Sequence, residues 1–132
     1  MILTIEVILI LTNEEKIKAK SFLNEVHACV QTGDFKIEQN TKNKRFERNY
    51  PTSPEDKKHM LLSLTEENCV KVDKNNNPSY EDAEVFVFIK KFTICVYGED
   101  MPVEMYIKMY IMSLAHYNKV IVISFHEEGD YR

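Results

Sequence analysis

The stretch MYIKMYIMSLAHYNKVIVISFHEEGD, residues 105–130, decides how the second half of this chain folds. Its two apolar segments, MYIKMYI and KVIVISF, are separated by a short polar loop at 113–118. Alternating apolar residues on both sides of such a short loop predict a hairpin of adjacent antiparallel strands, 105–111 and 120–125. We expect this hairpin to pack under a helix formed by residues 13–32.

The alternation of side chains along these strands brings chemically useful groups together. Tyr106 and Lys108 share one face of the first strand, because strand side chains alternate with period two. On the second strand, one face is expected to carry Val120, Val122, Ser124 and His126. A phenol, an ammonium, a hydroxyl and an imidazole then converge at one edge of the sheet. A hydrophobic core does not need this set, whereas phosphodiester chemistry can use all of it.

Size and composition indicate one globular domain. A chain of 132 residues with 44% hydrophobic composition is long enough for a single core, so we predict one domain over 1–132. The first segment, MILTIEVILIL (1–11), has no basic leader, contains Glu6 and is shorter than a bilayer span. We interpret it as a buried strand or a hydrophobic N-terminal extension, and we expect no membrane partner.

The charge of the chain is unevenly distributed. The net charge of −4 counts against a strong nucleic-acid binder, which usually carries a basic field. From 36 to 58, however, seven Lys or Arg residues accompany four Asp or Glu residues, a local excess of three. Such a patch can engage phosphate, and its candidate RNA-binding residues are Lys42, Lys44, Arg45 and Arg48.

The cysteines argue for a reducing compartment. Cys29, Cys69 and Cys95 form no CxxC pair and leave one residue over, so a disulfide framework is not expected. A cytoplasmic protein fits this pattern best.

Capping signals predict two N-terminal helices. Thr12 and Glu15 form a capping box before a run of apolar residues at helical spacing, which Gly33 is placed to end. Ser53, followed by Pro54 and two acids, begins the second helix. Between them, 35–39 is a short strand candidate, and the polar, basic stretch 40–50 is assigned no element.

From residue 68 onward the pattern is that of strands. The segments are NCVKV, EVFVFIKK, FTICVYG, VEMYIKMYI and KVIVISF, and 92–97 either forms its own strand or continues the preceding one through a bulge. Two helices followed by such strands predict an α+β fold, with the helices packed on a small antiparallel sheet.

The histidines do not form a metal site by their spacing. None of His27, His59, His116 and His126 has another histidine at a ligand spacing, so we expect no metal and no cofactor. His126 is distinctive because it ends an apolar strand and precedes two glutamates, where an imidazole can exchange protons. The alternative is a solvated, partly exposed histidine at a sheet edge. Lys71 and Lys108 can likewise be outward-facing lysines whose alkyl chains cover apolar neighbours.

Four blocks, in this order, resemble toxins of the MqsR type: FLNEVHACVQTG (22–33), LLSLTEENCVKV (61–72), MYIKM (105–109) and VIVISFHEE (120–128). These are small bacterial ribonucleases of type II toxin–antitoxin systems. The resemblance implies a RelE-like fold, metal-independent cleavage of mRNA, and a cognate antitoxin protein as partner. A homodimer is left open.

The resemblance also implies a catalytic set. The lysine that closes the family's DFYK block falls on Lys71, the tyrosine of its YLK block falls on Tyr106 with Lys108 two residues on, and the lysine or histidine of its closing SF[KH]E block falls on His126. The chain departs from the pattern elsewhere. Asn68, Cys69 and Val70 replace the aspartate and two aromatics, no tryptophan is present, and Val87 takes the place of an active-site glutamine when FVFIK (86–90) is matched. A second register matches CVYG (95–98) instead.

Three functions therefore remain open from the sequence. The first is the toxin endoribonuclease. The second is a non-catalytic protein-binding regulator on a similar α+β fold, which the acidic balance favours. The third is a phage- or plasmid-borne inhibitor unrelated to RNA cleavage.

Overall fold

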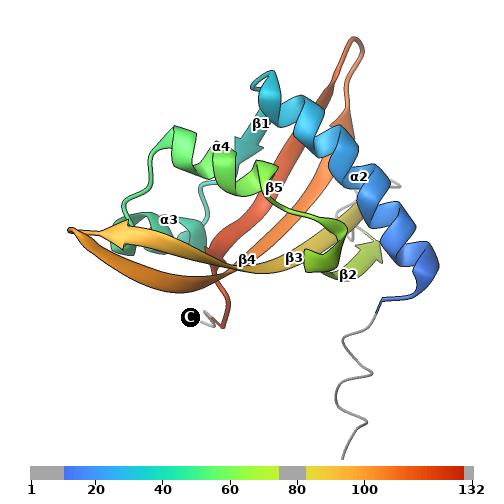
Figure 1. Cartoon of the computed structure of the whole chain (residues 1–132). Coiled ribbons are helices and arrows are strands. Elements are labelled where there is room, and N and C mark those ends of the chain that lie inside the picture. The colour runs from blue at the N-terminus through green and yellow to red at the C-terminus, as the bar shows by residue number, and fades with distance from the viewer. Residues whose placement is uncertain (1–10, 75–82, 130–132) are drawn as a thin grey trace, which may run out of the picture.

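The structure is a computed structural model that describes residues 11–74 and 83–129. It is an α+β fold in which three helices, all in the first half of the chain, pack on a five-stranded mixed sheet (Figure 1). Among the described residues, no helix is long and apolar enough to cross a membrane. The predicted N-terminal extension falls mostly outside the described residues, but its last residue, Leu11, is buried in the core.

The two helices predicted from capping signals are both present. Helix α2 (Asn13–Gln31) begins at Thr12, whose hydroxyl accepts from the Glu15 N–H while the Glu15 carboxylate accepts from the Thr12 N–H. Helix α4 (Pro54–Leu62) begins with the same reciprocal pair between Ser53 and Asp56. Each pair satisfies backbone donors that a helix start leaves without intrahelical partners.

A third helix, α3 (Thr41–Asn49), lies in the stretch to which the sequence analysis assigned no element. Asn40 caps its start by accepting a hydrogen bond from the Asn43 N–H at 3.0 Å. The helix buries only Asn43 and Phe46, because most of its residues are charged or polar. A single 3₁₀ turn, η1 (Glu66–Asn68), follows α4.

The sheet has the strand order β1-β5-β4-β3-β2 and differs from the predicted antiparallel sheet. Strand β1 (Phe35–Ile37) pairs in parallel with β5 (Asn118–Glu127), so the sheet is mixed. A parallel pair needs a long crossover, and the α3, α4, β2, β3 and β4 segments between β1 and β5 provide it. Strand β2 (Cys69–Lys74) forms the other edge.

The predicted hairpin of 105–111 with 120–125 is confirmed. Strand β4 (Glu99–Ser113) pairs antiparallel with β5, and the ladder closes at Ser113 opposite Asn118. Residues 92–96 continue the preceding strand, which is one of the two alternatives of the sequence analysis, but without the bulge expected there: β3 (Glu84–Val96) pairs with β4 without a register shift. Tyr97 and Gly98 join them with φ of 50° and 87°, as a two-residue type I′ turn requires.

The core lies between the helices and one face of the sheet. Phe22 of α2 stacks on Phe86 of β3 with ring centroids 3.9 Å apart, and Phe46 of α3 meets Phe125 of β5 edge to face at 5.7 Å. The side chains of Met105, Ile107 and Met109 in β4 are fully buried on this face. We call this the inner face of the sheet and the opposite one the outer face.

Candidate functional site

One row of side chains crosses four strands on the outer face. The ladder pairs Lys71 with Val87, Val87 with Lys108, and Lys108 with Ser124. Residues directly opposite each other in a ladder project from the same face. This face is the outer one, because Lys108 lies between Ile107 and Met109, both buried in the inner-face core. The predicted lysines therefore belong to the same face and to a single row.

The next row places the phenol against the imidazole. Tyr106 lies directly opposite His126 in the β4–β5 ladder, and the two rings stack with centroids 5.5 Å apart and planes inclined by 18°. Because Tyr106 and Lys108 are two residues apart on one strand, this pair is adjacent to the lysine row. We call Lys71, Tyr106, Lys108, Ser124 and His126 the outer-face site.

A β-bulge puts Ser124 and His126 on the outer face. Lys108 pairs with Ser124, but the next residue, Met109, pairs with Val122, so Ile123 is an extra residue on β5. Bulges of this kind change which residues face each side of a strand. The predicted alternation that put Val120 and Val122 on the same face as Ser124 and His126 is therefore wrong: the two valines lie in the inner-face core.

The side chain of Asn43 in α3 forms hydrogen bonds with backbone groups at this bulge. Its amide nitrogen donates to the Ile123 carbonyl at 3.0 Å and to the Glu38 carbonyl at 2.9 Å, and its amide oxygen accepts from the Phe125 N–H at 2.8 Å. β1 ends at Ile37, so this side of β5 has no strand neighbour at the bulge, while the other side stays paired with β4. The sequence analysis missed Asn43, and its only signal was a cap-like spacing after Asn40.

The hydrogen bond of His126 determines which of its two ring nitrogens carries the proton. Nδ1 lies 2.9 Å from the Glu127 carbonyl oxygen, which can only accept a hydrogen bond, so Nδ1 carries the proton. In the neutral ring Nε2 is then the nitrogen that can accept a proton. The side chain is buried, with 6% exposed, so the expectation of a partly exposed strand-end histidine is wrong. The ladder continues past it to Met105 and Glu127, which makes it an interior position.

Lys71 has a carboxylate partner that the sequence analysis did not identify. Its Nζ lies 3.0 Å from Oδ2 of Asp73, which is two residues on and thus on the same face of β2. The hydrogen bond and the charge of Asp73 raise the pKa of Lys71, and the phenol of Tyr106 contributes a smaller effect in the same direction. Lys71 is therefore a charged group at the rim of the site, with most of its side chain in solvent.

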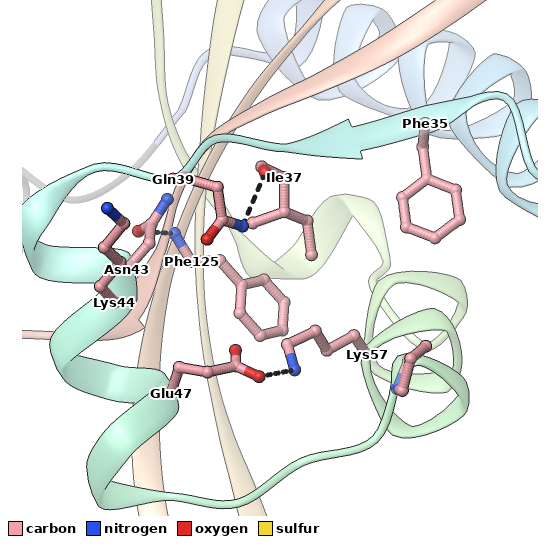
Figure 2. Close-up of a pocket in the computed structure, with 9 residues that line it drawn as sticks. Phe35, Ile37, Gln39, Asn43, Lys44, Glu47, Lys57 and Phe125 are labelled. Atoms are coloured by element: carbon pink, nitrogen blue, oxygen red, sulfur yellow. Dashed lines mark hydrogen bonds and ion pairs between the residues drawn. The ribbon is translucent and has the colours of Figure 1, made fainter.

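The four predicted RNA-binding residues do not form one patch. Asn43 and Phe46 define the buried side of α3, and helical spacing puts Lys44 and Glu47 on one flank and Lys42 and Arg45 on the other. Lys44 lines a cavity between β1, α3 and α4 (Figure 2). Arg48 points away from the buried side by the same spacing. Only Lys42 and Arg45 lie on the flank away from that cavity.

No metal centre is visible in the described part of the chain. Within 11–74 and 83–129, no group of three or more His, Cys, Asp or Glu side chains is arranged to hold a metal ion. The outer-face site offers one imidazole, one phenol, one hydroxyl and two ammonium groups. These groups suit proton transfer and the binding of anions rather than metal coordination.

Comparison of the chain with known protein families, curated proteins and solved structures finds no match.

Proposed function

We propose that this chain is the toxin component of a type II toxin–antitoxin system, a metal-independent endoribonuclease with a RelE-like fold that cleaves mRNA in the cytoplasm. The observation that supports this most is the stacked pair of Tyr106 and His126 beside Lys108 on the outer face of the sheet. It combines a proton acceptor, a hydroxyl donor and a cation within two adjacent rows of the ladder. The proposal also draws on the MqsR-type resemblance of the sequence blocks.

In the proposed reaction the 2′-hydroxyl of a nucleotide attacks the adjacent phosphorus. Nε2 of His126 accepts the proton of that hydroxyl, because Nδ1 already donates to the Glu127 carbonyl. The new bond closes a 2′,3′-cyclic phosphate, and the bond to the 5′-oxygen breaks. The Tyr106 hydroxyl donates a proton to the leaving oxygen, and the stacked His126 returns one to the phenolate. No redox partner or metal is needed for this balance.

Lys108 and Lys71 have different roles in the proposed reaction. Lys108 lies next to Tyr106 on β4 and faces Ser124 across the ladder, so its ammonium is placed to stabilise the charge that grows on the phosphorane oxygens. Lys71 is two strands away, with Val87 between the two lysines, and its charge is shared with Asp73. We assign Lys71 to binding the flanking phosphate. A cognate antitoxin would neutralise the toxin by covering this face.

The test is expression of the chain in a bacterial host without a partner, with growth and RNA integrity followed together. We expect growth arrest and cleaved mRNA, and purified protein should cleave RNA equally well with and without EDTA. His126→Ala should lower cleavage by about 10²–10⁴-fold, the usual contribution of a general acid–base group. His116→Ala, in the exposed loop 114–117, is the matched control and should cleave like the wild type.

A second candidate is a non-catalytic protein-binding module. It is favoured by Val87, which is buried between Lys71 and Lys108 where a polar active-site residue is expected, and by the net charge of −4. If wild-type protein cleaves no RNA, with or without ribosomes, this candidate replaces the first. If it cleaves RNA and His126→Ala cleaves equally well, His126 has no part in the mechanism.

A further inference from the structure

The first turn of α3 lies against β5 directly beside the outer-face site. The side-chain amides of Asn40 and Asn43 both donate to the Ile123 carbonyl, at 2.8 and 3.0 Å. Ile123 is the extra residue of the β5 bulge, and Ser124 of the outer-face site follows it. Lys42 lies between the two asparagines, so its backbone is held next to the bulge.

The two flanks of α3 face opposite sides of the sheet. Figure 2 shows Glu47 directed into the cavity between β1, α3 and α4, which is lined by Phe125 of the inner-face core. Helical spacing places Lys42 on the other flank of α3, and therefore on the side of the outer face. The Lys42 side chain is half-buried there, so its alkyl chain lies against the protein surface.

Two cations on either side of Ser124 have no carboxylate partner. Within 11–74 and 83–129, neither Lys42 nor Lys108 forms an ion pair. Lys71, at the far end of the same row, shares its charge with Asp73 at 3.0 Å. Three lysines and one aspartate leave this row with a net charge of +2, although the whole chain carries −4. The positive charge of the row is therefore concentrated on both sides of Ser124.

Along β4, by contrast, no further cation accompanies Lys108 on the outer face. In one direction the strand presents Tyr110 and Met112, which belong to an outer-face apolar cluster. In the other direction it presents Tyr106 and then Glu104. A chain of phosphates that approaches Lys108 is therefore better stabilised across the strands than along them.

The charges that flank this row compensate one another. Lys36 of β1 lies 3.7 Å from the Glu38 carboxylate. Lys91 of β3 lies directly opposite Glu104 in the ladder. Neither pair offers a net positive charge, so the flanks do not provide a second path for an anion.

We propose that Lys42 binds a backbone phosphate of the RNA on the β5 side of the scissile bond, so that the substrate strand crosses the outer face perpendicular to the β-strands. The strand then runs from Lys71 over Lys108 and Ser124 to Lys42. From Lys71 to Ser124 it crosses three strand spacings, about 14 Å. This inference rests on the proposed ribonuclease function and adds the path of the substrate to it. Phosphate contacts of this kind position a nucleic acid without selecting its sequence.

The test measures binding of a mixed-sequence 2′-O-methyl RNA of about eight nucleotides to the full chain by fluorescence anisotropy. This strand has no free 2′-hydroxyl and cannot be cleaved. Lys42→Met should weaken binding about fivefold at low salt and lower the salt slope by about 0.7, the loss of one phosphate contact. Lys42→Arg should retain both values. Lys44→Met removes the same charge two residues along, on the cavity flank, and should change the affinity by less than about twofold.

A second measurement places the contact relative to the scissile phosphate. A dinucleoside monophosphate offers the scissile phosphate alone, so Lys42→Met should leave its cleavage unchanged, whereas Lys108→Met should lower it. With an unmodified RNA of about eight nucleotides, Lys42→Met should raise KM about fivefold and leave kcat unchanged.

The outcomes separate the path of the strand from the ribonuclease function. Unchanged affinity of Lys42→Met in a protein that cleaves RNA overturns the path alone. Equal weakening by Lys44→Met and Lys42→Met also overturns it, because the whole helix then acts as a basic surface. Binding that depends on Lys42 without any cleavage supports the path and overturns the ribonuclease function. No binding of the 2′-O-methyl strand by the wild type at about 100 μM overturns the path.

Discussion

The side-chain amide of Asn43 donates a hydrogen bond to the carbonyl of Ile123, the extra residue of the β5 bulge, at 3.0 Å. The same amide accepts from the Phe125 N–H two residues on, so one buried side chain supports both ends of the bulge. Ser124 and His126 reach the outer face because of this bulge. Asn43 is therefore a positioning residue for the outer-face site, although it lies on a helix and on a different part of the chain.

Asn43→Ala should destabilise the fold by about 2 kcal/mol, because it leaves the buried Phe125 N–H without a partner. The Ile123 carbonyl loses one of two side-chain donors and keeps the Asn40 amide at 2.8 Å. Urea unfolding followed by circular dichroism measures the change. Asn49→Ala, an exposed position on the same helix, should change stability by less than about 0.5 kcal/mol. Equal losses for the two variants would show that the bulge does not depend on Asn43.

The elements that the sequence predicted are those with a strong local signal. The capping boxes at Thr12 and Ser53 determined the starts of α2 and α4, and the alternating apolar residues of 105–111 and 120–125 determined the central hairpin. Helix α3 was not predicted because Phe46 is its only buried apolar residue, so it has no apolar stripe. Its stability depends on tertiary contacts with β5, which no local pattern reports.

The candidate site was predicted in part, and for a reason that was partly wrong. Tyr106 and Lys108 share a face by simple alternation, as expected. His126 joins them only because the bulge at Ile123 changes the alternation of β5, which depends on Asn43 from a distant segment. The parallel pairing of β1 with β5 was likewise beyond local patterns, since three residues carry too little signal to choose a partner.

The three thiols should differ sharply in reactivity. Cys29 and Cys69 are buried, and burial is the main cause that raises the pKa of each thiol, whereas Cys95 is exposed on β3. The thiolate is the reactive form, so iodoacetamide at neutral pH should modify Cys95 first and the other two only on unfolding. Mass spectrometry over time should show one adduct. The Cys95→Ser variant should show none in the folded state, and rapid double modification of that variant would contradict the burial of Cys29 and Cys69.

Acid should weaken the start of α4. The hydrogen bonds of Asp56 with the Ser53 backbone and side chain hold the pKa of its carboxyl below the ordinary value of 3.8. A carboxyl with a lowered folded-state pKa contributes stability above its unfolded value, and this contribution is lost as the pH falls through the folded value. Asp56→Asn should therefore lower the urea midpoint at pH 7, and the difference from the wild type should shrink below about pH 4. Glu128→Gln, at an exposed position beyond β5, should show no such pH-dependent difference.

The two lysines of the outer-face site should contribute unequally to RNA cleavage. Lys108 is half-buried, adjacent to Tyr106 on β4 and opposite Ser124, whereas most of the Lys71 side chain is in solvent and its Nζ lies 3.0 Å from Asp73. An ammonium that contacts the phosphorane stabilises the transition state more than one that is solvated and shared with a carboxylate. Lys108→Met should therefore lower kcat by about 10²-fold, and Lys71→Met should act mainly on KM, by about tenfold or less.

Single-turnover cleavage of a short RNA measures both effects, and its salt dependence adds a second readout. Each lysine that contacts a phosphate contributes to the decline of binding with salt, so both variants should reduce that slope. Lys91→Met, an exposed lysine farther along the same face of β3, is the matched control for loss of positive charge and should change neither kcat nor the slope. If Lys91→Met and Lys108→Met lower cleavage to the same extent, the effect is one of net charge, and Lys108 has no specific role at the phosphorus.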